Sequence, residues 1–311
     1  MHRNSYDNDN STFSPQGRLH QVEYALEAVK QGSACVGLRS KTHVILLGLK
    51  RSTGELASYQ KKLIRIDDHL GISIAGLTSD ARVLSNFMRT QAMSSRMLYN
   101  RPLPVSRIVN AIADKAQINT QHYGRRPYGV GLLVAGYDEK GPHLYEFSPS
   151  GNCLEYFAMS IAKAPRPTSK RTSTSSPNRT IGTGDLPTLI KHGLHALRDT
   201  LQQDKELTIH NTSIGIVGVS PLSASAPPST STEAPSSSTL GPEPSAGTLG
   251  GAFDKFRIVE GEDLTPYLES MDPKDRDDEP VPTRETTGVA GEAPAGEGQP
   301  TQSAGDEMQT D

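Results

Sequence analysis

An amphipathic pattern near the start of the chain predicts a helix that precedes every strand. Between residues 18 and 30, apolar side chains recur at steps of three and four and form one stripe: Leu19, Val22, Leu26 and Val29. A turn is expected at Ser14-Pro15-Gln16-Gly17, with Pro in second place and Gly in fourth. Gly32 is placed to end the helix in a left-handed conformation. On its own, the stripe favours a helix that packs on the chain's own core.

The pattern after residue 32 predicts strand pairs interrupted by helices. Strands are expected at residues 34–38, 43–50, 62–66, 70–75, 128–137, 143–147, 152–156, 213–218 and 253–259. The first helix of this part is expected to be capped by residues 76–80 and to share one face among Val83, Leu84, Phe87 and Met88. The second should point Val105, Ile108, Val109 and Ile112 inward, and further helices are expected at 186–201 and from 263. This order is typical of an α+β fold with two stacked sheets and outer helices.

Composition limits the folded part to one domain of the 311-residue chain. Hydrophobic residues make up only 34%, but the deficit is concentrated in three segments rich in Ser, Thr, Pro, Gly and acid: 162–185, 219–251 and 272–311. We therefore expect an N-terminal part at 1–31, a sandwich domain at 32–271, and an acidic disordered tail at 272–311.

Charge and cysteine content exclude several classes of function. The net charge of −3 argues against a general nucleic-acid binder. No apolar run is long enough to cross a bilayer, so no membrane partner is expected. Cys35 and Cys153 have neither metal nor redox spacing, which favours a reduced intracellular compartment. His192 and His195 lie three apart without a nearby acid or Cys ligand, so a solvated helix face is the better interpretation than a metal site.

The N-terminal sequence resembles the signature of proteasome α-type subunits. Three features carry the resemblance: the Tyr6-Asp7 pair, the Ser-Pro-x-Gly-Arg turn at 14–18, and Val-Glu-Tyr-Ala at 22–25. Tyr-Asp-Asn-Asp at 6–9 and Arg-Arg-Pro-Tyr-Gly at 125–129 are most similar to the alpha type-1 member. The resemblance covers roughly residues 1–161, 186–218 and 252–270. It implies a four-layer α-β-β-α sandwich, the fold of N-terminal-nucleophile hydrolases, in a non-catalytic form.

Two segments depart from that family. Residues 162–185 stand where an amphipathic helix is usual, but their Ser, Thr and Pro content cannot form one. We hypothesise an out-of-frame or mis-spliced translation, which sequencing of the transcript would decide. Residues 219–251 interrupt an expected hairpin and are predicted to be a disordered surface loop.

Active members of the fold use an N-terminal Thr whose own amine is the base. Here Ser33 occupies that position, Lys62 matches the activating lysine, and Leu49 replaces the orienting carboxylate. The alternative function is therefore a peptidase or amidohydrolase with Ser33 exposed by cleavage. We disfavour it because an activated nucleophile needs all its partners.

The resemblance implies a gating role for two groups of residues. The segment 1–13 would lie over an axial pore, with an open form held by Tyr6, Asp7, Pro15 and Tyr24, where a Tyr hydroxyl and an Asp carboxylate of adjacent chains pair. Asn8 replaces the Arg that follows Tyr-Asp in many relatives, which makes the share of this chain in closing the gate less certain. A second loop would narrow the pore below the gate through Tyr123, Arg126 and Tyr128.

The resemblance also implies partners. Leu19, Val22, Leu26 and Val29 would contact a neighbour in a ring with six other α subunits, which flanks the β-ring subunits. Lys62, with Gly76, would receive the C-terminal carboxylate of a regulatory ATPase particle or another activator; the plain alternative for Lys62 is an exposed strand lysine. No cofactor or metal is implied, and the expected location is cytoplasm and nucleus. A stand-alone adaptor that uses its acidic tail is a third possibility and predicts a monomer.

Overall fold

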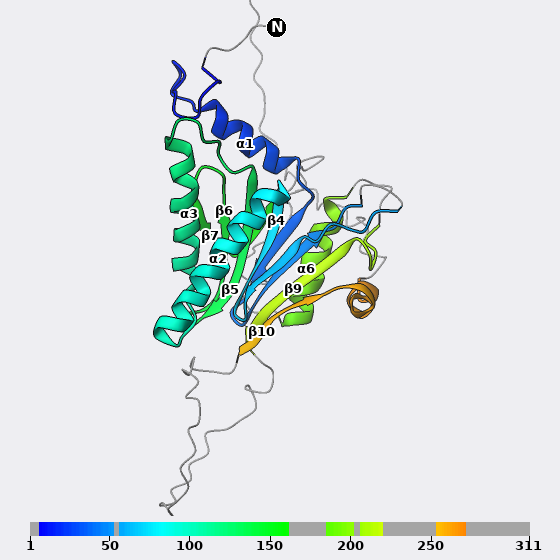
Figure 1. Cartoon of the computed structure of the whole chain (residues 1–311). Helices are drawn as coiled ribbons and strands as arrows, with labels where there is room; N and C mark the ends of the chain where they lie inside the picture. Colours follow the sequence, from blue (N-terminus) through cyan, green and yellow to red (C-terminus); the bar gives the residue numbers. More distant parts are fainter. Residues whose placement is uncertain (1–5, 53–55, 162–184, 202–205, 220–252, 272–311) are drawn as a thin grey trace, which may run out of the picture. The chain divides into compact units, whose positions relative to one another are not determined.

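The computed structural model describes residues 6–52, 56–161, 185–201, 206–219 and 253–271. They form two five-stranded antiparallel sheets, drawn in Figure 1. The first sheet has the order β10-β9-β2-β1-β8, with β1 Cys35–Arg39, β2 His43–Leu49, β8 Ala158–Ile161, β9 Thr212–Val219 and β10 Phe253–Val259. The second has the order β3-β4-β5-β6-β7, with β3 Leu63–Asp67, β4 Leu70–Gly76, β5 Val130–Asp138, β6 Gly141–Phe147 and β7 Cys153–Glu155.

The two sheets pack face to face over a shared apolar layer. Leu46 of the first sheet and Leu133 and Leu144 of the second are fully buried in this layer. Close approach depends on Gly37 in β1, because a Cβ there would lie 2.7 Å from the Leu144 side chain. The inner layer therefore joins both sheets into one core.

Helices cover the outer faces. On the second sheet lie α2 Thr78–Tyr99 and α3 Val105–Gln121, and on the first lie α6 Leu186–Asp199, the 3₁₀ helix η2 Gly261–Leu264 and α7 Thr265–Glu269. The helix α1 His20–Lys30 packs against β4 and β5. The predicted four-layer α-β-β-α sandwich is confirmed. None of the helices in the described part of the chain is long and apolar enough to span a membrane.

Most of the expected elements are present, with bounds shifted by a few residues. The inward set of α3 is buried as predicted. Val83 is wrong as a core position, because it is 49% exposed while Asp80, Ala81 and Leu84 face inward. Strand β8, which is four residues long, was not predicted. All but the last residue of the predicted anomaly at 162–185, most of the insert at 219–251 and the tail at 272–311 lie outside the described residues.

The end of α1 also differs from expectation. Gln31 ends the helix in a right-handed conformation, and Gly32 has no positive φ. Gly32 is required for a different reason: a Cβ would lie 2.5 Å from the backbone nitrogen of Gly76. The constraint is a close approach between two segments and not a left-handed cap.

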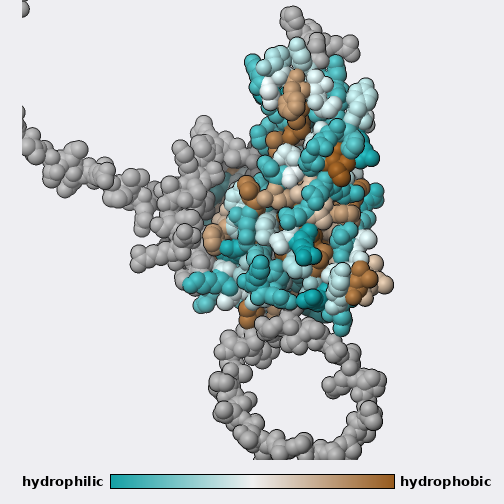
Figure 2. Space-filling model, turned by 90° about the vertical axis from the view of Figure 1, so that its left-hand side faces the viewer, coloured by the Kyte–Doolittle hydropathy of each residue, from teal (hydrophilic) through white to brown (hydrophobic). Residues whose placement is uncertain are grey.

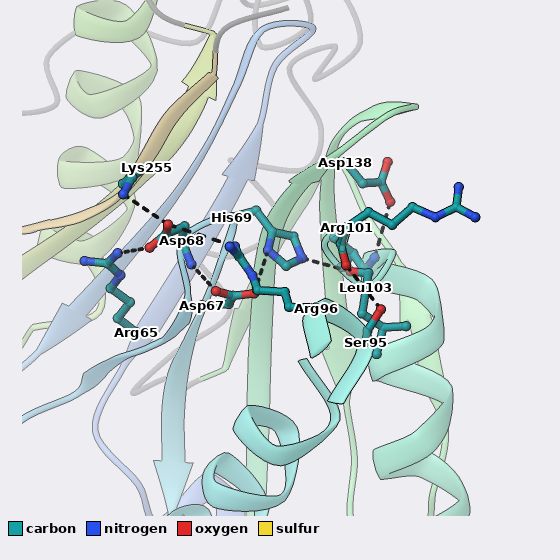
Figure 3. Close-up of polar contacts among 11 residues, drawn as sticks. Arg65, Asp67, Asp68, His69, Ser95, Arg96, Arg101, Leu103, Asp138 and Lys255 are labelled. Atoms are coloured by element: carbon teal, nitrogen blue, oxygen red, sulfur yellow. Dashed lines mark hydrogen bonds and ion pairs between the residues drawn. The ribbon is translucent and has the colours of Figure 1, made fainter. Parts of the chain in front are cut away.

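A polar network ties the β3–β4 turn to α2 and to the α2–α3 connection (Figure 3). The Asp67 carboxylate contacts His69 Nδ1 at 3.3 Å and Arg96 Nε at 3.0 Å, while His69 Nε2 lies 2.8 Å from the carbonyl oxygen of Leu103. Although burial opposes ionisation, the bonds from His69, from the backbone of Asp68 and from Arg96 keep the pKa of Asp67 well below its usual range. This network fixes the end of the second sheet that lies away from α1.

Candidate functional site

The N-terminal segment, residues 6–13, is attached to α1. The Tyr24 hydroxyl donates to Asp7 Oδ2 at 3.2 Å, and the Gln21 side-chain amide donates to the Asp7 carbonyl. Burial and the Asp7 carboxylate raise the pKa of Tyr24. Two of the predicted gate residues, Asp7 and Tyr24, are thus brought together. Their hydrogen bond lies within one chain, whereas the resemblance placed such a pair between adjacent chains.

The predicted turn before α1 is confirmed. The Gly17 N–H donates to the Ser14 carbonyl at 2.8 Å, and Ser14 Oγ accepts from the Arg18 N–H at 3.1 Å. Gly17 has φ +75°, a conformation that side chains disfavour, and Pro15 is exposed at the tip. The turn therefore presents Pro15 to solvent next to the start of α1.

The apolar stripe of α1 is only partly covered. Val29 is buried against the inner layer, and Leu19 and Val22 are half-buried. Leu26 is 36% exposed. Figure 2 shows hydrophobic side chains scattered among hydrophilic ones on the face of the molecule that it draws. The chain's own core therefore accounts for one end of the stripe and leaves the rest accessible.

A second loop, residues 122–129, follows α3 near the N-terminal segment (Figure 1). Tyr123 is 86% exposed, whereas Tyr128 packs against the core under α2 and α3. The Arg126 guanidinium makes two hydrogen bonds to the Asp80 carboxylate, at 2.7 and 2.8 Å, and the Gly129 N–H adds a third at 2.9 Å. These bonds lower the pKa of Asp80, first through Arg126. Arg126 therefore anchors the loop, and of the three predicted pore residues Tyr123 is the one that projects freely.

The predicted docking residues lie close together, but Lys62 is not an exposed strand lysine. It is 4% exposed, and its Nζ donates to the Ile74 carbonyl at 2.9 Å. Burial lowers the pKa of Lys62. Gly76, two residues beyond Ile74, has φ +106° and leaves no room for a Cβ, which would lie 2.4 Å from the Gly129 carbonyl.

A groove of about 680 Å³ runs beside the edge strand β3, next to this pair. Its lining carries basic side chains from β3, from the residues before it and from α2: Lys61, Arg65, Arg82 and Arg89. Glu260 and Asp263 also line it. The groove can attract a carboxylate, although the Lys62 amine itself lies inside the chain and not in this lining.

Ser33 is placed poorly for nucleophilic attack. It is 3% exposed, and no hydrogen bond joins it to Lys62, although both lie in the described part of the chain. The Lys62 amine is engaged by the Ile74 carbonyl instead. Leu49, in the position of the orienting carboxylate, can accept no hydrogen bond through its side chain.

Comparison with known proteins gives the family. The family described as proteasome subunit matches residues 29–217, and the N-terminal signature of the A class of these subunits matches residues 6–28. The chain belongs to the proteasome α-type family. The signature coincides with the segment, the turn and the helix whose contacts are given above.

Several α-type relatives are matched over most of their length. The chain is 61% identical to a probable alpha type-6 proteasome subunit of Schizosaccharomyces pombe over 218 residues, 70% of this chain and 79% of that protein. It is 53% identical to the alpha type-6 proteasome subunit of Saccharomyces cerevisiae over 223 residues, 70% and 93% of the two chains. It is 52% identical to the alpha type-1 proteasome subunit of Dictyostelium discoideum over 219 residues, 70% and 88%. Both alpha type-1 and alpha type-6 subunits occur among these relatives, so the comparisons do not distinguish the expected similarity to type-1 from similarity to type-6.

Two residues of this α-type chain were missed by sequence reasoning. Asp80 was interpreted only as part of a helix cap, but Leu77 is the cap residue and Asp80 instead holds Arg126. Nothing in the sequence pattern marks Asn10, yet it is buried and contacts the end of α3. No periodic pattern could have found either, because each partner lies more than 40 positions away in the sequence.

Proposed function

We propose that the chain is a non-catalytic subunit of the proteasome core α ring, which helps to control substrate entry and to dock regulatory particles in ubiquitin-dependent degradation. The match of residues 6–28 to the α-type signature carries the proposal. The Asp7–Tyr24 hydrogen bond and the Ser14–Gly17 turn support it, because they hold this signature in a defined place on α1.

The proposed partners are six other α subunits in a heptameric ring, the β-ring subunits, and regulatory ATPase particles or other activators. The uncovered part of the α1 stripe supports contact with a neighbouring α subunit, since a helix face with a surplus of apolar area is stabilised by a further partner. On this proposal the chain works in the cytoplasm and nucleus, which microscopy of a fluorescently tagged chain checks.

The test of membership is affinity purification of the tagged full-length chain, with native mass and partner identification. We expect a particle of core-proteasome size that contains other α chains. A monomer would contradict the proposal and favour the stand-alone adaptor.

The gating role is tested by deletion of residues 2–12 in assembled particles. We expect faster peptide hydrolysis without an activator, because the segment over the pore is removed. Unchanged basal turnover in particles that contain the shortened chain would contradict this role.

The docking role of Lys62 requires its amine to turn from Ile74 toward a chain-end carboxylate, and the basic lining of the neighbouring groove supports attraction of such an end. Lys62→Ala should weaken binding of the ATPase particle on native gels and leave ring assembly intact. Lys41→Ala is the matched control, because Lys41 is exposed and does not line the groove. Docking that survives Lys62→Ala contradicts the role.

The non-catalytic character is supported by the burial of Ser33 and by Leu49 in place of a carboxylate. Mass spectrometry of the mature N-terminus tests it. A chain that starts at residue 1 or 2 agrees with the proposal, whereas a chain that starts at Ser33 would favour the peptidase alternative.

A further inference from the structure

Asn10 joins the N-terminal segment to the end of α3. Its side chain is 3% exposed, although its neighbours along the segment are exposed or half-buried. The Asn10 amide nitrogen donates to the carbonyl oxygens of Asn119, at 2.5 Å, and His122, at 3.1 Å. These acceptors lie 109 and 112 residues further along the chain, so the contact is tertiary.

The end of α3 needs these donors. The last carbonyls of a helix have no partner within the helix, and a left-handed glycine often supplies the missing bonds. Here the capping residue is His122 in an extended conformation, φ −93° and ψ 127°, whose N–H satisfies only Ile118. Asn10 supplies the cap from outside the helix. It thereby also holds the first residue of the 122–129 loop.

The orientation of the Asn10 amide follows from its partners. Both neighbours are carbonyl oxygens, which only accept, so the NH₂ group must face them. The other atom, Oδ1, is buried and has no hydrogen-bond partner in the described part of the chain. A buried acceptor without a hydrogen-bond partner lowers the stability of the fold. The two hydrogen bonds of the Asn10 amide nitrogen offset this cost, so they, and not packing of the side chain alone, account for its burial.

A turn at residues 9–12 directs the Asn10 side chain toward α3. The Asp9 carboxylate accepts hydrogen bonds from Ser11 Oγ at 2.5 Å and from Thr12 Oγ1 at 3.4 Å. These bonds fold residues 9–12 into a compact turn, in which Asp9 is directed to its own neighbours and Asn10 to the body of the domain.

We propose that Asn10 is a positioning residue of the gate, which anchors the N-terminal segment, residues 6–13, to the end of α3. The proposal rests on the proposed gating function. Asn10 also couples the segment to the 122–129 loop, whose far end is fixed independently by Asp80.

The test uses Asn10→Leu in assembled particles, because leucine keeps nearly the same shape but donates no hydrogen bond. Asn8→Leu is the matched control in the same stretch, where Asn8 is exposed. We expect basal peptide hydrolysis to rise several-fold in Asn10→Leu particles, with activator-stimulated hydrolysis unchanged. Unchanged basal hydrolysis, or basal and stimulated rates that fall together, would overturn the positioning role.

A second readout is amide hydrogen exchange of the full-length chain. The His122 and Arg125 amides, which donate to Ile118 and His122, should lose protection by about tenfold in Asn10→Leu and not in Asn8→Leu. Unchanged exchange would overturn the anchor even if the gate leaks. If the chain does not enter particles, the proposed function fails, and the exchange experiment still decides whether the anchor exists.

Discussion

The helices α3 and α1 carry similar sequence patterns but differ in what covers them. The four predicted inward residues of α3, from Val105 to Ile112, are all buried by the second sheet and α2. In α1, Val29 is buried, while Leu26 remains exposed. An amphipathic pattern thus predicts that the apolar stripe of a helix is buried, but it does not say whether the same chain or another chain buries it. In α1 the stripe extends beyond the surface that its own chain provides.

The largest expected effect on stability comes from truncation of a buried residue of α3. Ile112→Ala should lower the free energy of unfolding by about 2–5 kcal/mol, because it opens a cavity in a fully buried layer. Urea denaturation of the full-length chain measures it. A loss below about 1 kcal/mol would mean that the layer under α3 repacks easily.

A smaller loss is expected where polar contacts hold the loop after α3. Asp80→Asn keeps the shape of the side chain but removes its charge, and should lower stability by about 1–2 kcal/mol, since water replaces part of the contact with the largely exposed Arg126. Arg126→Ala in the Asp80→Asn background should then add little in a denaturation cycle. Additive losses would show that the two side chains act separately.

The third prediction concerns the ion pairs of His143 in β6, next to the edge strand β7 of the second sheet. His143 lies between Asp138, at 3.0 Å, and Glu155, at 2.7 Å, and these bonds raise the pKa of His143, that to Asp138 first, although burial opposes them. A raised pKa stabilises the fold fully below the unfolded value, about 6.5, and this stability is lost as pH rises through the folded value. His143→Gln should therefore cost about 1 kcal/mol at pH 6 and less at pH 9 in urea denaturation. A loss that grows with pH would contradict this pairing.

The smallest effect on stability is expected on the exposed side of α1. Leu26→Ala should change the unfolding free energy of the chain by less than about 0.5 kcal/mol, because the side chain is not in the core. Val29→Ala, three positions further, should cost more than Leu26→Ala because Val29 is buried. Equal losses in urea denaturation would show that α1 packs uniformly and would remove the contrast with α3.

The sequence predicts those parts of the structure that depend on local or periodic signals. The strands with apolar runs, the α3 stripe and the Ser14–Gly17 turn each follow from neighbours within a few positions. The reason for Gly32 and the burial of Lys62 depend on segments that meet only after folding. Long-range polar contacts are also hidden, as with Asn10 and His122, because a single donor leaves no pattern in the sequence. The family resemblance placed Asp7 and Tyr24 in one cluster with Tyr6 and Pro15 and expected a Tyr–Asp pair between adjacent chains. The structure shows that Tyr24 and Asp7 are bonded within one chain.

The most direct test of the α1 interface is incorporation of tagged Leu26→Asp chain into core particles, quantified by native mass and compared with Glu27→Asp. Both variants place an aspartate in the same helix, but only the first puts a charge on the uncovered apolar stripe. We predict that Leu26→Asp is largely excluded from particles while Glu27→Asp is incorporated like the unchanged chain. Equal incorporation of the two variants would contradict the claim that α1 is covered by a neighbouring chain of the ring.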